Sequence, residues 1–112
     1  MERLIISVLL IFVSSNSLGN SSFGTQRITA VTVHDSGNLI VTIAGNSHSE
    51  TCPDENRVNT LVLNPDSPHL KEMYATSLAA YLTGKAISGW VNGCVTFWGY
   101  NLPKATVISI HD

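Results

Sequence analysis

Aromatic side chains gather near the C-terminal end of the chain, beside amides and an amine. Trp90, Phe97, Trp98 and Tyr100 lie within eleven residues of one another. Aromatic faces stack on the C–H faces of sugars, and amides and amines bind hydroxyl groups; amphipathic aromatic residues also favour protein interfaces. The segment therefore predicts a site for a glycan or a protein partner. Its predicted binding residues are Phe97, Trp98, Tyr100, Asn101 and Lys104.

The hydrophobic core is the alternative place for each of these rings. A core position is favoured for Trp90 and Phe97, because large aromatic side chains are buried on average. For Trp98 and Tyr100 both interpretations stay open. Gly99, between two aromatic residues, indicates a turn or a close backbone approach.

Two further groups contain residue types that do chemistry. His48 and Glu50 would point to the same side of a strand, and with a third ligand they could hold a metal ion. A solvated loop is the favoured interpretation. Asp54 and Glu55 are adjacent, so in an extended segment their carboxylates diverge and cannot flank one bond. Arg57 is expected to pair with one of them and hold the loop in place.

Neither catalysis nor nucleic-acid binding is expected. The sequence has no Gly-x-Ser-x-Gly or Ser-x-x-Lys motif and no glycine-rich phosphate loop. Stabilising a transition state needs several converging groups, and only 12% of the residues are charged. An enzyme is therefore the least favoured class, and no cofactor is expected. The net charge of −2 excludes an electrostatic nucleic-acid binder, which needs a basic face.

The N-terminal segment has the pattern of a secretory signal peptide. A polar start with one Arg is followed by the apolar run Leu4–Val13 and then by small residues, with Ser17 and Gly19 as candidate cleavage positions. The apolar run is half the roughly 20 residues that span a bilayer. We expect residues 1–19 to be removed, leaving one domain over 20–112 without a stable membrane anchor, periplasmic or secreted. A buried N-terminal strand is the alternative.

Cys52 and Cys94 are the only cysteines. Two cysteines in a small exported chain predict one disulfide, worth about 4 kcal/mol in the chain-entropy treatment. A redox pair or a metal site is the alternative, although the Cys-x-x-Cys spacing typical of either is missing.

Strands and one helix must position these residues. Alternating, β-branched patterns predict strands, and apolar residues at spacings of three and four predict a helix with Ser67 as N-cap and Gly84 as left-handed C-cap. The predicted strands are Gln26–His34, Leu39–Ala44, Asn56–Leu63, Lys85–Val91 and Ala105–His111, and the helix is Pro68–Thr83. Its predicted core stripe is Leu70, Met73, Tyr74, Leu78, Tyr81 and Leu82.

Three segments are less regular. Asn20–Thr25 is polar and is expected to be a loose lead. Asn92-Gly93 is a tight-turn signal. Cys94–Tyr100 fits a strand or an ordered loop equally well.

The order of elements is three strands, one helix and two strands. An open three-stranded sheet cannot bury so apolar a set of strands on both faces, whereas a closed sheet plugged by the helix can. The expected fold is mainly β with one helix: a small five-stranded antiparallel barrel of the OB type (β-β-β-α-β-β) with one disulfide. A flat α+β sheet crossed by one helix is the alternative.

Several short motifs resemble a group of small exported bacterial proteins, most of them uncharacterised. These motifs are Thr51-Cys52-Pro53-Asp54-Glu55-Asn56-Arg57, Lys71-Glu72-Met73-Tyr74, Leu78-Ala79-Ala80, Gly84-Lys85 and Gly93-Cys94. The element order also resembles the B subunits of bacterial toxins that carry five binding subunits per catalytic subunit. That likeness implies an OB-fold barrel, a pentameric ring and binding of cell-surface glycans, and it carries over no sugar-binding residue.

Three functional hypotheses follow. The first is an exported, non-catalytic binding module, similar to a toxin B subunit, that binds a glycan or a partner through the aromatic loop. The second is a periplasmic inhibitor or accessory protein that docks on an enzyme. The third is a metal-dependent activity at His48 and Glu50.

Overall fold

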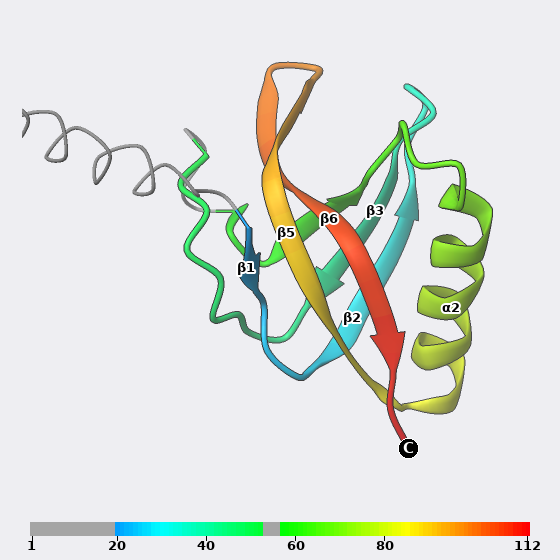
Figure 1. Cartoon of the computed structure of the whole chain (residues 1–112). Helices are drawn as coiled ribbons and strands as arrows, with labels where there is room; N and C mark the ends of the chain where they lie inside the picture. The colour runs from blue at the N-terminus through cyan, green and yellow to red at the C-terminus, as the bar shows by residue number, and fades with distance from the viewer. Residues whose placement is uncertain (1–19, 53–56) are drawn as a thin grey trace, which may run out of the picture.

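The protein is mainly β with one helix, as the sequence predicts (Figure 1). The computed structural model describes residues 20–52 and 57–112. The predicted signal peptide, together with Asp54 and Glu55, lies outside the described residues. The strands are β1 (Ser21–Ser22), β2 (Gln26–Val33), β3 (Leu39–Ile43), β4 (Thr60–Leu63), β5 (Ala86–Phe97) and β6 (Tyr100–Ile110), and the helix is α2 (Leu70–Thr83). No helix in this part of the chain is long and apolar enough to cross a membrane.

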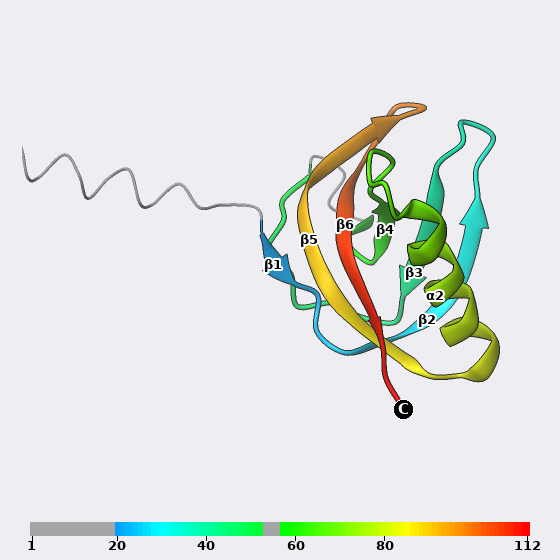
Figure 2. The ribbon, with the colours of Figure 1, turned by 45° about the vertical axis from the view of Figure 1, so that its right-hand side comes forward.

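The strand pairings close on themselves. Strand β5 pairs with β2 on one side and β6 on the other, and the order β2-β3-β4-β6 joins these two neighbours (Figure 2). Strand β1 adds a short pairing on β5. The prediction of purely antiparallel pairing is wrong at one place, because β4 and β6 run parallel. Parallel neighbours need a long crossover, and α2 with β5 forms it here.

The main core lies between the sheet and α2. Its fully buried side chains come from all parts of the chain, which ties the strands to one another and to the helix. They include Phe23, Val41, Ile43, Leu61, Leu63, Ile87, Val91 and Ala105. A second, smaller cluster contains Ile40, Val62 and Leu102.

The segment Asn20–Thr25 is not the loose lead that its composition suggests. Ser21 and Ser22 pair with Val91 and Trp90 of β5. Phe23 is completely buried, and its N–H donates to the Gly89 carbonyl at 3.1 Å. One aromatic residue among polar neighbours makes no periodic pattern, so the sequence does not reveal that it belongs to the core.

The turn predicted at Asn92-Gly93 is also wrong. Strand β5 continues through this dipeptide to Phe97, and its register with β6 shifts between Val91 and Cys94. Gly93 has φ +79°, a conformation that costs glycine little. The positive φ is therefore accommodated in a bulge within the strand. The stretch Cys94–Tyr100, which fitted strand or loop, forms the end of β5 and a two-residue turn.

Helix α2 begins two residues later than predicted, and its predicted core stripe is confirmed in part: Met73 is buried, and Leu70 and Tyr74 pack against the core. The Ser67 hydroxyl oxygen accepts the His69 N–H at 3.0 Å just before the helix, but the predicted N-cap at Ser67 is wrong, because His69 is the N-cap and no side chain caps the helix. Gly84 is the left-handed C-cap, as predicted. The buried helix residues are Met73, Ser77 and Ala80. The predicted core stripe fails at Tyr81 and Leu82, both of which are exposed. Met73 and the small side chains at 77 and 80 lie on the face that is buried, whereas Tyr81 and Leu82 lie outside it.

Replacement of the buried aromatic ring in the N-terminal segment tests its place in the core. We expect Phe23→Ala to lower the free energy of unfolding by about 3–5 kcal/mol, because it removes a fully buried ring. Val33→Ala, at a side chain that is 63% exposed, is the matched control and should stay within about 0.5 kcal/mol of the parent. Urea denaturation followed by circular dichroism measures both. Equal midpoints for the two variants would contradict the assignment.

Candidate functional site

Two hairpin turns meet at one end of the molecule and bring aromatic rings together. The β2–β3 turn contributes His34, and the β5–β6 turn contributes Phe97, Trp98 and Tyr100. The His34 ring lies 5.0 Å from that of Phe97 and 4.9 Å from that of Trp98, both edge to face. Phe97 in turn contacts Tyr100 at 6.3 Å between ring centroids. We call these four residues the tip site.

Trp98 is the most unusual residue of the tip site. Phe97 pairs with Tyr100, so Trp98 and Gly99 form a two-residue hairpin turn, with φ +51° and +80°. Positive φ at both central residues is the geometry of a type I′ turn, where Asn-Gly is preferred. A bulky side chain in this region is strained by roughly 1–2 kcal/mol. The Trp98 side chain is nevertheless 67% exposed, so core packing does not explain why a tryptophan stands there.

The tip site rests on the smaller core cluster. Val95 and Phe97 pack against Ile40, Val62 and Leu102, which lie on three different strands. Phe97 is half-buried, because one side of it packs on this cluster while the other contacts His34 and Tyr100. The turn that carries Trp98 is held on a packed base.

A cation completes the site from a third segment. The Arg57 guanidinium carbon lies 4.3 Å from the centre of the Tyr100 ring, which is cation–π geometry. The predicted pairing of Arg57 with Asp54 or Glu55 falls outside the described residues. This places a guanidinium, which carries several N–H donors, at the edge of the tip site.

The other two predicted binding residues lie apart from the tip site. Asn101 pairs with Thr96, whose hydroxyl donates to the Asn101 side-chain oxygen at 2.8 Å. Because side chains alternate along a strand, this pair projects from the face opposite Phe97 and Tyr100. Lys104 is farther along β6, and its side chain lies beside Gly93 of β5. A Cβ atom placed on Gly93 would be 3.9 Å from the Lys104 Cε. The structure thus brings three of the five predicted residues together.

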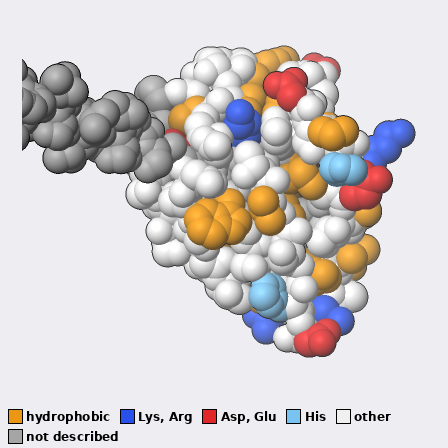
Figure 3. All heavy atoms as spheres, in the orientation of Figure 1, with side chains coloured by type: hydrophobic (Ala, Val, Ile, Leu, Met, Phe, Trp, Pro, Cys, Tyr) orange, Lys and Arg blue, Asp and Glu red, His pale blue; other side chains and the backbone are white. Residues whose placement is uncertain are grey.

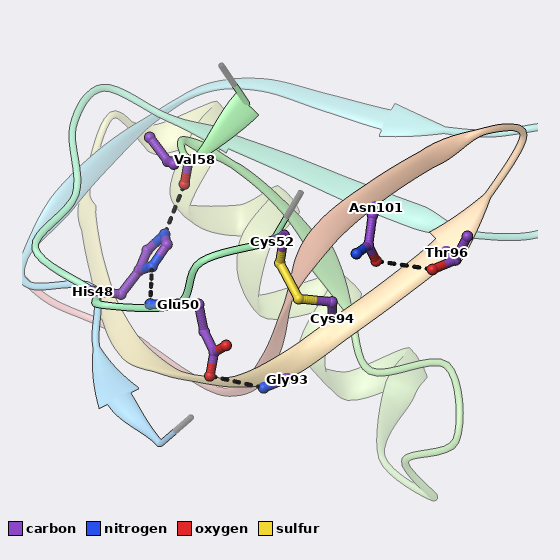
Figure 4. Close-up of a disulfide and its surroundings, with 8 residues drawn as sticks. All are labelled: His48, Glu50, Cys52, Val58, Gly93, Cys94, Thr96 and Asn101. Carbon is purple, nitrogen blue, oxygen red and sulfur yellow. Dashed lines mark hydrogen bonds between the residues drawn. A yellow bond between two sulfur atoms is a disulfide. The ribbon is translucent and has the colours of Figure 1, made fainter. Parts of the chain in front are cut away.

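His48 and Glu50 anchor the long loop, His48 to Val58 before β4 and Glu50 to β5 (Figure 4). His48 Nε2 donates to the Val58 carbonyl at 2.8 Å, and Nδ1 accepts the Glu50 N–H at 3.2 Å. The Glu50 carboxylate accepts the Gly93 N–H, at the bulge, at 3.0 Å. Both imidazole nitrogens and the carboxylate are therefore engaged in structural bonds. No cluster of three metal-ligating side chains occurs in residues 20–52 and 57–112.

The predicted disulfide is present beside these bonds. Cys52 and Cys94 are joined with 6.2 Å between their Cα atoms, and Cys52 is buried. The bridge and the Glu50–Gly93 hydrogen bond attach the loop to neighbouring residues of β5. This leaves no free cysteine among the described residues for a redox or metal role.

Trp90 is not in the core, contrary to the favoured interpretation. It is 44% exposed and pairs with Val107, itself exposed, on the outer face of β5 and β6. Figure 3 shows hydrophobic side chains on this face amid uncharged neighbours. Ser88 of β5 and His111, the residue after β6, have Oγ and Nε2 2.7 Å apart. This pair is exposed, and no pocket occurs in the described part of the chain.

His34 is the tip-site residue that sequence reasoning missed. It stands 63 positions before Phe97 in the chain. Its position at the end of a strand, next to a turn, marks it only as a loop residue.

Comparison of the chain with protein-family models, curated proteins and solved structures gives no match.

Two substitutions at Trp98 separate backbone strain from side-chain contact. Trp98→Asn and Trp98→Ala both remove the ring, but asparagine tolerates positive φ far better than alanine. We expect the Asn variant to be more stable than the Ala variant by about 0.5–1 kcal/mol in urea denaturation. Equal stability would show that the backbone at residue 98 relaxes without strain.

Proposed function

We propose that this protein is an exported, non-catalytic binding module that holds a glycan at the tip site. The observation that supports this most is Trp98, an exposed tryptophan in a backbone conformation that suits asparagine or glycine. Strain of this kind is retained at functional positions. A ring so presented offers a flat apolar face, as sugar stacking requires.

The neighbours of Trp98 favour a sugar over a purely apolar ligand. Phe97 and Tyr100 extend the aromatic surface, while His34 and Arg57 add N–H donors at its margin. Sugars combine C–H faces with hydroxyl acceptors, which matches this mixture. A protein partner would need about 800 Å² from each side, much more than one hairpin turn presents.

The strand order supports an OB-type barrel as the scaffold. The pairings run in a closed circuit through five strands, and α2 lies between the third and fourth of these along the chain. The tip site is formed by the turns after the first and the fourth of these strands. In OB-type folds such loops bind oligosaccharides and oligonucleotides, and the net charge of −2 argues against the latter.

Export is supported by the disulfide together with the N-terminal signal pattern. Disulfides persist in oxidising compartments, so a bridged domain fits a periplasmic or secreted protein.

Binding to a glycan array tests the proposal. We expect Trp98→Asn, which keeps the turn geometry, to weaken binding at least about 30-fold, the effect of losing a 2 kcal/mol anchor. The matched control is Trp90→Phe on the outer β5–β6 face, which should bind like the parent. Unchanged binding by the Asn variant would show that the ligand does not bind at the tip site. If the parent protein binds no glycan on the array, the proposal that its ligand is a sugar is wrong.

Docking on an enzyme is the second candidate. The β5–β6 hairpin ends in an exposed tryptophan and could insert into a partner's cleft. In that case the parent protein would bind no glycan but would capture a periplasmic hydrolase. Trp98→Asn would abolish that capture.

A ring of identical subunits is the assembly that fits this module. A closed ring needs two different contact patches on each subunit. Uncharged, exposed side chains occur on two elements: Trp90 and Val107 on the β5–β6 face, and Leu82, which is 72% exposed, on α2.

Light scattering on a sizing column measures the assembly. We expect a mass about five times that of one chain. For Leu82→Lys we expect it to fall toward the mass of a single chain, because a charge in the subunit contact disfavours burial. Lys71→Ala, at an exposed position earlier on the helix, is the control and should keep the larger mass. A monomeric parent protein would contradict the ring.

A further inference from the structure

Asn92-Gly93 is the only Asn-Gly dipeptide in the chain, and the tip site does not use it. In an Asn-Gly pair the glycine nitrogen can attack the asparagine side chain, because no Cβ atom hinders its approach. Asn92 is exposed, so its side-chain amide is open to water. The dipeptide therefore has the composition and the exposure of a site for spontaneous deamidation.

The reaction needs only this dipeptide and water. The Gly93 nitrogen forms a bond to Asn92 Cγ, the bond from Cγ to Nδ2 breaks, and ammonia leaves with the proton that the Gly93 nitrogen carried. Water then opens the cyclic imide at either of its two carbonyls, which gives aspartate or isoaspartate. The isoaspartate product carries one additional methylene in the main chain.

The nitrogen that would attack is held by a carboxylate in the structure. The Gly93 N–H donates to Glu50 Oε2 at 3.0 Å (Figure 4). The imide nitrogen carries no hydrogen, so this hydrogen bond and the closed ring exclude each other. A hydrogen bond to an ionised acceptor is stronger than one between neutral groups. It must be broken before the nitrogen can react.

The main chain is fixed on both sides of the dipeptide. Ring closure requires the asparagine backbone to rotate away from the extended conformation of a strand. Val91, on one side, pairs with Ala105. Cys94, on the other, pairs with Pro103 and is bonded to Cys52. The reaction therefore requires that the loop and this part of β5 separate locally.

We propose that Asn92-Gly93 is a modification site, at which the Glu50 carboxylate suppresses deamidation for as long as the loop is attached to β5. Local detachment of the loop frees the Gly93 nitrogen and allows the imide to form. Each conversion to isoaspartate lengthens the main chain inside the bulge, at the base of the hairpin that carries Trp98. No ligand takes part, so this inference does not depend on the proposed function.

Mass spectrometry after incubation of the full, disulfide-bonded chain measures the conversion. Conversion adds about 1 Da to the peptide that contains residue 92, and chromatography separates its aspartate and isoaspartate forms. In the parent protein we expect conversion to be much slower than in the same protein unfolded in urea. Glu50→Ala removes the acceptor and should raise the rate in the folded protein by about tenfold.

Two variants separate loss of this hydrogen bond from other effects. Glu50→Gln keeps a side-chain oxygen that can accept the Gly93 N–H, so its rate should stay close to that of the parent. Thr96→Ala is the matched control on the same strand, because it removes the hydrogen bond to Asn101 and leaves the Glu50 contact in place. It should also convert at the parent rate. Far-UV circular dichroism checks that each variant is folded.

Amide hydrogen exchange in the parent protein adds a measurement that needs no variant. The Gly93 N–H should exchange at least about tenfold more slowly than in urea. An unprotected Gly93 N–H overturns the proposal, and so do equal conversion rates for the parent and a folded Glu50→Ala variant. A Glu50→Gln rate well below that of the parent also overturns it, because the carboxylate would then promote the reaction as a base. If Glu50→Ala does not fold, the exchange rate and the Gln variant decide.

Discussion

Strand β5 is the element on which the rest of the structure depends, because it must pair with three other strands. It meets β1 and β2 along its first half and β6 along almost its whole length. A regular strand of twelve residues could not turn far enough to do this. The bulge between Val91 and Cys94 increases the local twist and separates the part that closes the sheet from the part that projects as a hairpin.

The bulge is stabilised from outside the sheet. The Gly93 N–H has its partner in the Glu50 carboxylate, and the next residue, Cys94, is bonded to Cys52. The loop before β4 thus satisfies a backbone group that the ladder leaves unpaired and adds a covalent tie. Since the projecting hairpin starts at this point, the same contacts orient the base of the tip site. The residues that looked like metal ligands serve the site indirectly, as its support.

The tip site shows where local preference and tertiary packing disagree. The turn geometry prefers Asn-Gly, yet the chain places Trp-Gly there. Ring contacts with His34 and the packing of Phe97 on the small core hold the strained turn. A local conflict of this kind is expected at functional positions.

Sequence patterning anticipated β2, β3, the helix, the disulfide and the aromatic character of the site. These depend on alternation, on spacing, on capping residues and on the number of cysteines, all of which are local or countable. It missed the burial of Phe23, the bulge at Gly93 and the exposure of Trp90, because each depends on what lies opposite in the sheet.

The amino-acid sequence by itself determined that aromatic side chains would gather near residues 97–100 and that strands would surround one helix. Only the tertiary structure decided which side chains share a surface. Pairing β2 with β3 and β5 with β6 puts two turns at one end, so His34 meets Trp98 while Asn101, one residue past Tyr100, faces the other way. Side chains alternate along a strand, and contacts between turns depend on how the sheet closes; neither can be read from residue types alone.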